Sequence, residues 1–539
     1  MKKYKNIIFW AGIVIIVFTS ILIRPLSNLD EIWNFNIARC ISNGLVPYKD
    51  ISMITTPALS FVTAVVLKIF GTEMFVTRIL AGLLAVVILI LIYKILKQIK
   101  INKILSFIIV LAITFLLKDF FALDYNFFAF AISLFIILLE LKSYNKNSKK
   151  YDIAIGILGG LAFCTKQSIG ILICLSIIIN KLFFIKNKTD VKRIFKQILF
   201  RLIGILIPVT ILFGYLLITK SFGDFIDYCV IGIQTFYNKK TYTELILSEN
   251  ILTKILSVCV PICIIMAVIT CIVLKMMKKN NLPLYVLTVY SLAIFSLVYP
   301  IADEAHFSVA SATTVILFIY ALKLVFKLIN KKLDKEPKIF TNKYVLEFFE
   351  FAVLLTVTLL TVNIEIKNID TLSSLSKYKS INNFKYIYVD SSISNLIEKT
   401  DEYIASQNKA VYILDSNAAV YMIPINRYNK NYDMFNVGNL GAGGEEAQIQ
   451  KIKNEDAKYL ILNRQYTINW QTPVTVKKYV EENLKYVESI GIYDVYENYD
   501  TKKNEDIQND ENLNNSEDVK DIQDAEDEKQ YKEAENDQN

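Results

Sequence analysis

The chain of 539 residues is 54% hydrophobic, has a mean hydropathy of +0.39 and carries a formal net charge of +8. Soluble domains contain about 45–50% apolar residues and no repeated apolar stretches of roughly 20 residues, whereas this chain has many. These values exclude a soluble single-domain enzyme and predict a polytopic α-helical membrane protein. The only histidine is His306, which excludes any site built on several histidines.

Apolar runs of membrane-spanning character recur along most of the chain. The first follows the basic residues Met1–Lys5 and covers about 6–23, and no small-residue cleavage site follows it, so we expect a transmembrane helix rather than a signal peptide. The others lie near 74–96, 104–118, 121–141, 152–165, 168–185, 200–219, 251–275, 283–300, 308–329 and 344–364. The pattern predicts about eleven transmembrane helices.

The connectors between these runs alternate in charge. Lysine gathers in 94–103, 142–150, 186–196, 275–279 and 323–343, which the positive-inside rule assigns to the cytoplasm together with the N-terminus. The remaining connectors then face outward, as does everything after the last run. These outward connectors are 25–72, 118–125, 165–168, 220–250 and 300–307. The basic residues are not interleaved with exposed aromatics, so we expect no nucleic-acid partner.

The C-terminal third changes in character. In residues 365–500, short strand-like segments (385–390, 410–415, 457–463, 486–495) alternate with helix-like ones (394–407, 444–454, 474–484), which favours a small extracytoplasmic α/β domain. Residues 501–539 carry fourteen Asp and Glu against five Lys and read as a disordered acidic tail. The expected division is therefore 1–364 in the membrane, 365–500 outside it and the tail 501–539.

Acidic residues recur at the predicted outer membrane edge, among them Asp30, Glu31, Asp124 and Asp303. Any one of them alone is more simply a solvated loop charge. Because charges near a membrane are costly, their recurrence on one side favours an active site at the external surface.

The first outward connector, 25–72, contains the most informative motifs. Asp30-Glu31 follows the first apolar run, Pro47-Tyr48-Lys49-Asp50 comes next, and Pro57 precedes an apolar helical stretch. Phe70-Gly71 then leads to Arg78 at the start of the second run. Both helical stretches in this connector have the spacing of amphipathic helices lying in the membrane interface.

This arrangement resembles the membrane-embedded GT-C glycosyltransferases, in particular the protein mannosyltransferase and lipid A aminoarabinose transferase branch. The resemblance is good over 28–80, looser to about residue 310, and does not specify the C-terminal domain. It extends to Asp124 in the second outward connector, to Thr165-Lys166 between two runs, and to Pro300…Asp303…His306. It implies transfer of a sugar from a polyprenyl-phosphate carrier to an acceptor on the external face.

The resemblance also implies roles for these residues. Asp30 would be the base that deprotonates the acceptor, and Glu31 and Asp124 would be further catalytic residues. Lys166, Arg78 and Arg39 would hold the donor phosphate through charge-assisted hydrogen bonds. Simpler interpretations are a snorkelling lysine at a helix end for Lys166 and a hydrogen-bonded loop residue for His306.

A divalent metal is a further open alternative. Asp303 and His306, with Glu31 or Asp124, offer ligands that would suit Mg²⁺ or Mn²⁺, and GT-C enzymes occur with and without a metal.

We therefore expect a glycosyltransferase of a bacterial cell membrane. The Lys-, Ile- and Asn-rich composition is typical of an AT-rich bacterial genome, which makes an undecaprenyl carrier and a cell-envelope polysaccharide, lipid or protein acceptor the expected partners. Two alternatives stay open: a transporter or flippase for envelope precursors, and a non-catalytic assembly protein for envelope glycopolymers.

Overall fold

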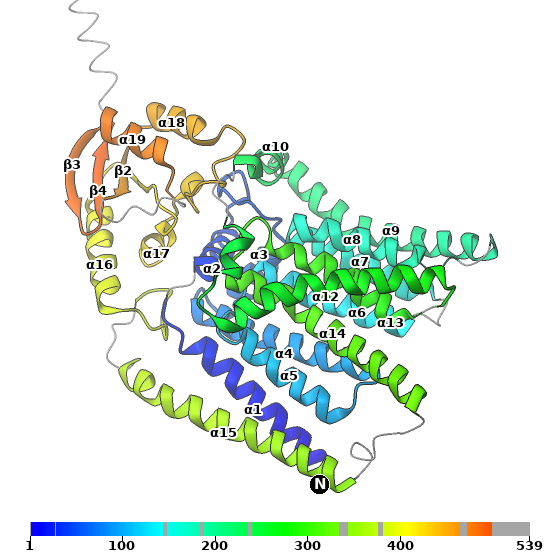
Figure 1. Ribbon diagram of the computed structural model, residues 1–539. Coiled ribbons are helices and arrows are strands. Elements are labelled where there is room, and N and C mark those ends of the chain that lie inside the picture. Colours follow the sequence, from blue (N-terminus) through cyan, green and yellow to red (C-terminus); the bar gives the residue numbers. More distant parts are fainter. Residues whose placement is uncertain are drawn as a thin grey trace, which may run out of the picture.

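The computed structural model describes residues 2–26, 29–143, 148–183, 185, 188–235, 240–279, 281–333, 343–375, 381–463 and 472–498. The acidic segment 501–539, expected to be disordered, lies outside these residues. A bundle of long helices makes up most of the molecule, and a smaller part with a β-sheet sits at one end of it (Figure 1).

Each apolar run in the sequence corresponds to one helix of the bundle. The helices are α1 (Lys2–Leu22), α4 (Met74–Gln98), α5 (Lys103–Leu117), α6 (Tyr125–Ser143), α7 (Lys149–Thr165), α8 (Gln167–Leu182), α9 (Lys188–Ile218), α12 (Ile251–Met276), α13 (Leu282–Phe295), α14 (Glu304–Leu333) and α15 (Lys343–Leu375). Within the described residues, seven helices are long and apolar enough to cross a membrane: α1, α4, α6, α9, α12, α14 and α15. Helices α5, α8 and α13 are apolar but shorter. Helices therefore occupy the eleven predicted runs, but only seven of those described have the length and hydropathy of a membrane span.

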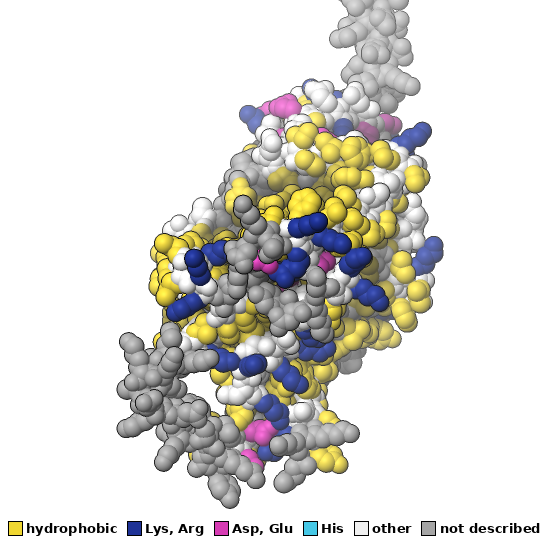
Figure 2. All heavy atoms as spheres, turned by 90° about the vertical axis from the view of Figure 1, so that its right-hand side faces the viewer, with side chains coloured by type: hydrophobic (Ala, Val, Ile, Leu, Met, Phe, Trp, Pro, Cys, Tyr) yellow, Lys and Arg dark blue, Asp and Glu magenta, His cyan; other side chains and the backbone are white. Residues whose placement is uncertain are grey.

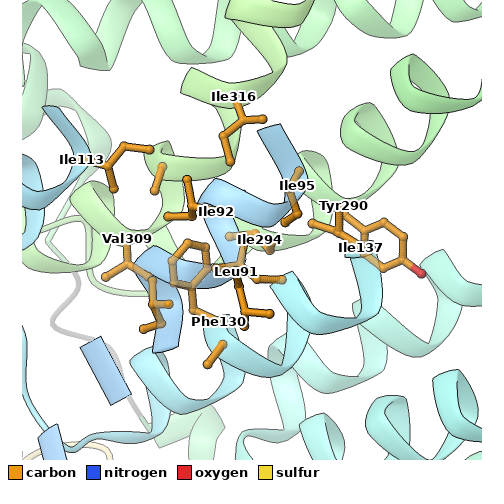
Figure 3. Close-up of a cluster of buried hydrophobic side chains, with 14 of the residues drawn as sticks. Leu91, Ile92, Ile95, Ile113, Phe130, Ile137, Tyr290, Ile294, Val309 and Ile316 are labelled. Carbon is orange, nitrogen blue, oxygen red and sulfur yellow. The ribbon is translucent and has the colours of Figure 1, made fainter. Parts of the chain in front are cut away.

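The centre of the bundle is filled by aliphatic and aromatic side chains. Figure 3 shows residues of α4, α5, α6, α13 and α14 pointing toward one another, with Ile92, Ile95 and Phe130 wholly buried. Burying such side chains contributes roughly 1.5–3 kcal/mol each in water, but in a lipid environment it is close packing that holds helices together. Glycine allows close packing where α7 crosses α9, because a Cβ at Gly156 would lie 2.2 Å from the carbonyl oxygen of Arg201.

Lysine and arginine gather on one face of the bundle. Figure 2 views the molecule from the right-hand side of Figure 1 and shows their side chains clustered over the centre of that face. Lys97, Lys100 and Lys103 flank the turn between α4 and α5, and Lys275 and Lys278 flank the turn after α12.

The two expected interfacial helices are α2 (Leu29–Ser42) and α3 (Ala58–Phe70). Helix α3 is amphipathic, and Val62, Val65 and Ile69 on its outer face are more than half exposed. Helix α2 differs from the expectation, because every residue from Glu31 to Cys40 is buried. The C-terminal part covers it: the Trp33 indole, for example, donates to the Ser416 carbonyl at 2.7 Å.

The segments between α9 and α14 that lie outside the long helices are short. They are α10 (Phe222–Phe225), a π-helical turn (Ile226–Ile231), a 3₁₀ turn (Gly232–Thr235), α11 (Tyr242–Ile246) and a second 3₁₀ turn (Ser296–Val298). The first three lie against the C-terminal part, where Asp227 accepts the Ala442 amide at 3.0 Å.

The C-terminal part contains a four-stranded mixed sheet of order β1-β2-β4-β3. Strands β1 (Ala410–Ile413) and β2 (Ala457–Leu462) are parallel, whereas β4 (Tyr493–Glu497) is antiparallel to β2 and to β3 (Lys485–Ile490). Helices α16 (Ser391–Ser406), α17 (Ala418–Met422), α18 (Gly444–Asn454) and α19 (Val474–Asn483) accompany it.

Two strand predictions in this part need correction. Segment 385–390 is not a strand of the sheet: Tyr388 forms an isolated bridge with Pro25 and accepts the Leu26 amide at 2.8 Å, so it ties the C-terminal part to the end of α1. The single strand expected at 486–495 is a hairpin, because Gly491 with a φ of +61° turns the chain between β3 and β4.

Candidate active site

Five of the predicted site residues meet at the end of the bundle next to α2. Asp30 lies in the first turn of α2, Asp124 immediately precedes α6, and Lys166 lies between α7 and α8. Asp303 and His306 lie at the start of α14. These positions are brought together because consecutive helices run in opposite directions, so outward connectors far apart in sequence share one end of the bundle.

Contacts through Tyr125 and Asn126 link Asp30, Lys166, Asp303 and His306, and Asp124 lies within electrostatic reach of Asp30. We call these five residues the Asp30 cluster (Asp30, Asp124, Lys166, Asp303 and His306). The His306 Nδ1 lies 2.8 Å from Asp303, and its Nε2 lies 3.3 Å from the Asn126 amide nitrogen. Lys166 Nζ donates to the Asn126 oxygen at 2.7 Å. Because the Asn126 nitrogen can only donate, His306 Nε2 accepts and the ring proton lies on Nδ1, facing Asp303.

Tyr125 joins Lys166 to Asp30. The Lys166 ammonium lies 4.9 Å from the centre of the Tyr125 ring, and the Tyr125 hydroxyl lies 3.4 Å from Asp30 Oδ1. Tyr125 and Asn126 are both in the first turn of α6, directly after Asp124, so one helix end supplies three side chains to the group.

Burial shifts the protonation of the cluster toward neutrality. It raises the pKa of Asp30 above its ordinary value, and together with the charge of Asp30 it raises the pKa of Asp124 to about 7. Burial also lowers the pKa of Lys166 to about 8, although the three surrounding carboxylates oppose this. For Asp303, burial pushes the pKa upward, but the hydrogen bonds from His306 outweigh it and leave the pKa below its ordinary value. Groups that titrate near neutral pH in a charged cluster are typical of proton-transfer sites.

Glu31 and Arg78 lie next to this cluster but are engaged with each other. Arg78 Nε and Nη2 donate to the two Glu31 oxygens at 2.9 and 3.2 Å, and both side chains are buried. Arg78 also donates to the carbonyls of Arg24 and Pro25. This geometry supports a structural role for the pair in joining α2, α4 and the end of α1, rather than the expected catalytic and phosphate-binding roles.

Arg39 lies farther along α2 and faces the C-terminal part. It donates to Asn36 at 3.0 Å, to Asn426 at 3.1 Å and to the Arg427 carbonyl at 2.6 Å, and it stacks on the Tyr428 ring at 4.7 Å. The side chain is wholly buried, so the structure does not bring it to the Asp30 cluster as a phosphate ligand.

Three residues of the site have no role predicted from the sequence: Tyr125, Asn126 and Arg24. The first two follow Asp124 directly, so their place at a helix start in an outward connector was a usable signal. Arg24 lies at the end of α1 within electrostatic reach of Glu31 and Asp124, and its Nη1 is buried without a hydrogen-bond partner. A single arginine after an apolar run gives no such signal.

For the divalent metal that the sequence leaves open as an alternative, the described residues around Asp303 and His306 offer no donor set of the usual kind. Within the described part of the chain, no group of three or more His, Cys, Asp and Glu side chains is placed to hold an ion. Asp303 and His306 are joined to each other, and Glu31 is joined to Arg78.

An apolar cleft of about 450 Å³ lies between α8, α12 and α13. Its walls include Leu172, Ile179, Val268, Tyr285 and Leu292. Leu172 is six residues after Lys166 along α8, which corresponds to about 9 Å at 1.5 Å per residue. The cleft therefore starts about 9 Å beyond Lys166 along α8 and extends to Phe183 at the far end of that helix.

Part of the chain resembles a known protein family in sequence. Residues 55–217 match the sequence model of the family described as dolichyl-phosphate-mannose-protein mannosyltransferase. No curated protein matches the chain by sequence.

Solved structures give matches over most of the chain. ArnT from Cupriavidus metallidurans in the apo state has a TM-score of 0.54 at 12% identity, covering 92% of this chain and 98% of that one. The same protein bound to undecaprenyl phosphate has a TM-score of 0.52 at the same identity and coverage. The Archaeoglobus fulgidus oligosaccharyltransferase in complex with Zn and sulfate has a TM-score of 0.42 at 14% identity and covers 77% of this chain and 61% of that one.

The likeness to ArnT shows a shared fold, and the family match falls on the helices that carry Asp124 and Lys166. The chain is therefore a helical membrane protein that shares the fold of ArnT.

Proposed function

We propose that the chain transfers a sugar from a polyprenyl-phosphate carrier to an acceptor of the cell envelope, and that the Asp30 cluster is its active site. The observation that carries this proposal is the meeting of carboxylates and a lysine from separate connectors at one end of the bundle.

In the proposed reaction Asp30 is the general base. It takes the proton of the acceptor hydroxyl while that oxygen attacks the anomeric carbon and the bond from this carbon to the phosphate oxygen breaks. A carboxylate with a raised pKa suits this role, because a base works best when its pKa lies near the working pH. Asp124 lies in the same site, so the two carboxylates titrate as a coupled pair.

Lys166 neutralises the leaving phosphate. Its contact with the neutral Asn126 oxygen leaves its charge uncompensated by any direct ion pair within the described residues, so it can attract a phosphate group. His306 and Asp303 hold Asn126 from the other side and so orient the lysine. A preorganised cation at the site of developing charge is a large catalytic contribution.

The carrier chain would lie in the apolar cleft between α8, α12 and α13. That ArnT binds undecaprenyl phosphate supports a lipid carrier of this chemistry. With its phosphate at Lys166, a polyprenyl chain that follows α8 would reach the cleft at Leu172.

The basic face in Figure 2 supports an orientation with the N-terminus in the cytoplasm and the Asp30 cluster at the external surface of a bacterial cell membrane. Residues 365–500 would then form an external domain that covers α2 and binds or orients the acceptor, and 501–539 an acidic tail.

The test is a transfer assay with purified protein, labelled polyprenyl-phosphate sugars and envelope acceptors. Asp30→Asn should lower transfer by about 10²–10⁴-fold, the usual loss for a general base. Asp119→Asn is the matched control: this carboxylate lies in the same connector as Asp124, is 66% exposed and pairs with its neighbour Lys118. Unchanged transfer in Asp30→Asn would overturn the assignment, and no transfer with any donor by wild type would favour a flippase or an assembly protein.

A further inference from the structure

A glutamine directly beside the proposed phosphate-binding lysine ties three parts of the chain together. Gln167 is the first residue of α8 and follows Lys166, which joins α7 to α8. Its amide nitrogen donates to the Ile54 carbonyl at 2.7 Å and to the Cys229 carbonyl at 3.0 Å. Both protons of the side-chain amide are therefore used, one on the first outward connector and one on the connector that follows α9.

The position of the turn between α7 and α8 decides where the Lys166 ammonium lies. The Lys166 backbone is extended between the two helices, and its Nζ reaches the Asn126 oxygen on α6 at 2.7 Å. The end of α7 is held as well, because the Thr56 hydroxyl donates to the Phe163 carbonyl at 2.7 Å. A displacement of about 1 Å at a reacting group can cost about a hundredfold in rate, so the contacts that fix this turn matter for a phosphate held by Lys166.

The connector that supplies the Cys229 carbonyl has an unusual backbone. Residues Ile226–Ile231 form a π-helical turn, a conformation that is rare and occurs frequently at functional sites. Tyr228 and Cys229 on this turn are buried. Phe225, directly before it, packs on Tyr48 with the ring centres 5.3 Å apart. The π-helical turn is therefore held in place by packing against the first outward connector.

The C-terminal part also contacts the π-helical turn. Asp227 Oδ1 accepts the Ala442 amide at 3.0 Å, and Lys451 Nζ donates to the Tyr228 hydroxyl at 3.3 Å. Gly441 has a φ of +79°, and a Cβ at this position would collide with the Asp227 carboxylate. The loop before α18 therefore comes so close to the turn that only glycine fits at the point of contact.

We propose that Gln167 is a positioning residue for the donor phosphate, and that the C-terminal part acts on it through the π-helical turn. Ala442 binds Asp227 on this turn, and two residues later the Cys229 carbonyl binds Gln167 beside Lys166. Docking of the C-terminal part then strengthens binding of the donor. The inference rests on the proposed role of Lys166 as the ligand of the donor phosphate.

Equilibrium binding of undecaprenyl phosphate to the full-length chain in detergent tests this proposal. The probe carries the phosphate and the chain of the proposed donor and does not depend on the identity of the sugar. Gln167→Met keeps the size of the side chain but removes both N–H donors, and it should weaken binding roughly tenfold or more, the usual scale for a supporting residue. Ser168→Ala, at the exposed next position of α8, should bind like wild type.

Asp227→Ala tests the path from the C-terminal part. It removes the acceptor of the Ala442 amide and should weaken binding of undecaprenyl phosphate roughly fivefold or more. In a Gln167→Met background the same change should add little, because two contacts on one path are not additive. Asp224→Ala is the matched control, since this carboxylate lies in the same connector and has no side-chain hydrogen bond among the described residues.

The outcomes separate this inference from the proposed function. If Lys166→Met weakens binding but Gln167→Met and Asp227→Ala do not, the path is wrong and the proposed active site stands. Equal losses from Asp227→Ala in the wild-type and Gln167→Met backgrounds would also overturn the path. If Lys166→Met binds the probe like wild type, the proposed role of Lys166 fails and this inference fails with it. Asp227 is only partly buried, so Asp227→Ala decides the question if Gln167→Met does not fold.

Discussion

Replacing Glu31 with glutamine should cost the protein much of its stability, because Arg78 would remain as a buried cation without a counter-ion. The pair is bidentate, with Arg78 side-chain exposure of 0% and Glu31 exposure of 2%. Removing one partner of a buried ion pair costs about 3–5 kcal/mol. At about 2 °C per kcal/mol, the midpoint of thermal unfolding should fall by roughly 6–10 °C.

A double variant separates a structural pair from a catalytic one. Glu31→Met with Arg78→Met removes both charges, and replacing a buried ion pair by apolar side chains of similar size is often neutral. Recovery should be partial here, because the carbonyls of Arg24 and Pro25 also lose the Arg78 donor. Glu73→Gln is the control, since its pair with the half-exposed Lys385 should contribute under about 1 kcal/mol.

The assay is thermal unfolding in detergent, followed by size-exclusion chromatography of heated samples, with transfer activity measured below the midpoint. An unchanged midpoint in Glu31→Gln together with lost transfer would refute the structural interpretation and return Glu31 to the reaction.

Three further results are expected. The rate of transfer should follow a bell-shaped pH profile. It should rise as Asp30, and Asp124 with its pKa of about 7, lose their protons, and fall above about pH 8 as Lys166 loses its proton. Lys166→Arg should shift only the alkaline limb to higher pH, and an unmoved limb would exclude Lys166 as its origin. Gly156→Ala should lower the midpoint of unfolding, because its Cβ would meet the Arg201 backbone and overpacking costs about 1–3 kcal/mol. Gly214→Ala should not, because no atom lies within 4 Å of the added Cβ. Equal midpoints for the two variants would contradict the close crossing of α7 and α9. Asn126→Leu should reduce transfer roughly tenfold or more, the usual scale for a supporting residue. The double variant with Lys166→Met should lose little more transfer than Lys166→Met alone. Additive losses would show that the two residues act separately.

The sequence predicted the helices of the bundle and the meeting of the Asp30 cluster for the same physical reason. Apolar length and lysine bias define which connectors share one end of a bundle, and Asp30, Asp124, Lys166 and His306 all lie in connectors of one kind. Helix direction alone then brings residues distant in sequence close together. No knowledge of side-chain packing was needed for this step.

The partners of the arginines could not be predicted in this way. Arg39 and Arg78 lie in the same region as the cluster, but their partners, the Arg427 carbonyl and Glu31, are chosen by packing. The burial of α2 likewise depends on the C-terminal part, which the sequence resemblance does not cover. The strand expected at 385–390 has the right composition, but its backbone bonds to the end of α1 instead of the sheet.

Single-turnover transfer, measured beside donor binding, tests the proposed active site most directly. With labelled polyprenyl-phosphate sugar in excess over its dissociation constant, Asp30→Asn should bind the donor as wild type does but transfer it at least about a hundredfold more slowly. Lys166→Met should instead weaken donor binding. Wild-type rates in Asp30→Asn together with wild-type donor affinity in Lys166→Met would show that the reaction takes place elsewhere.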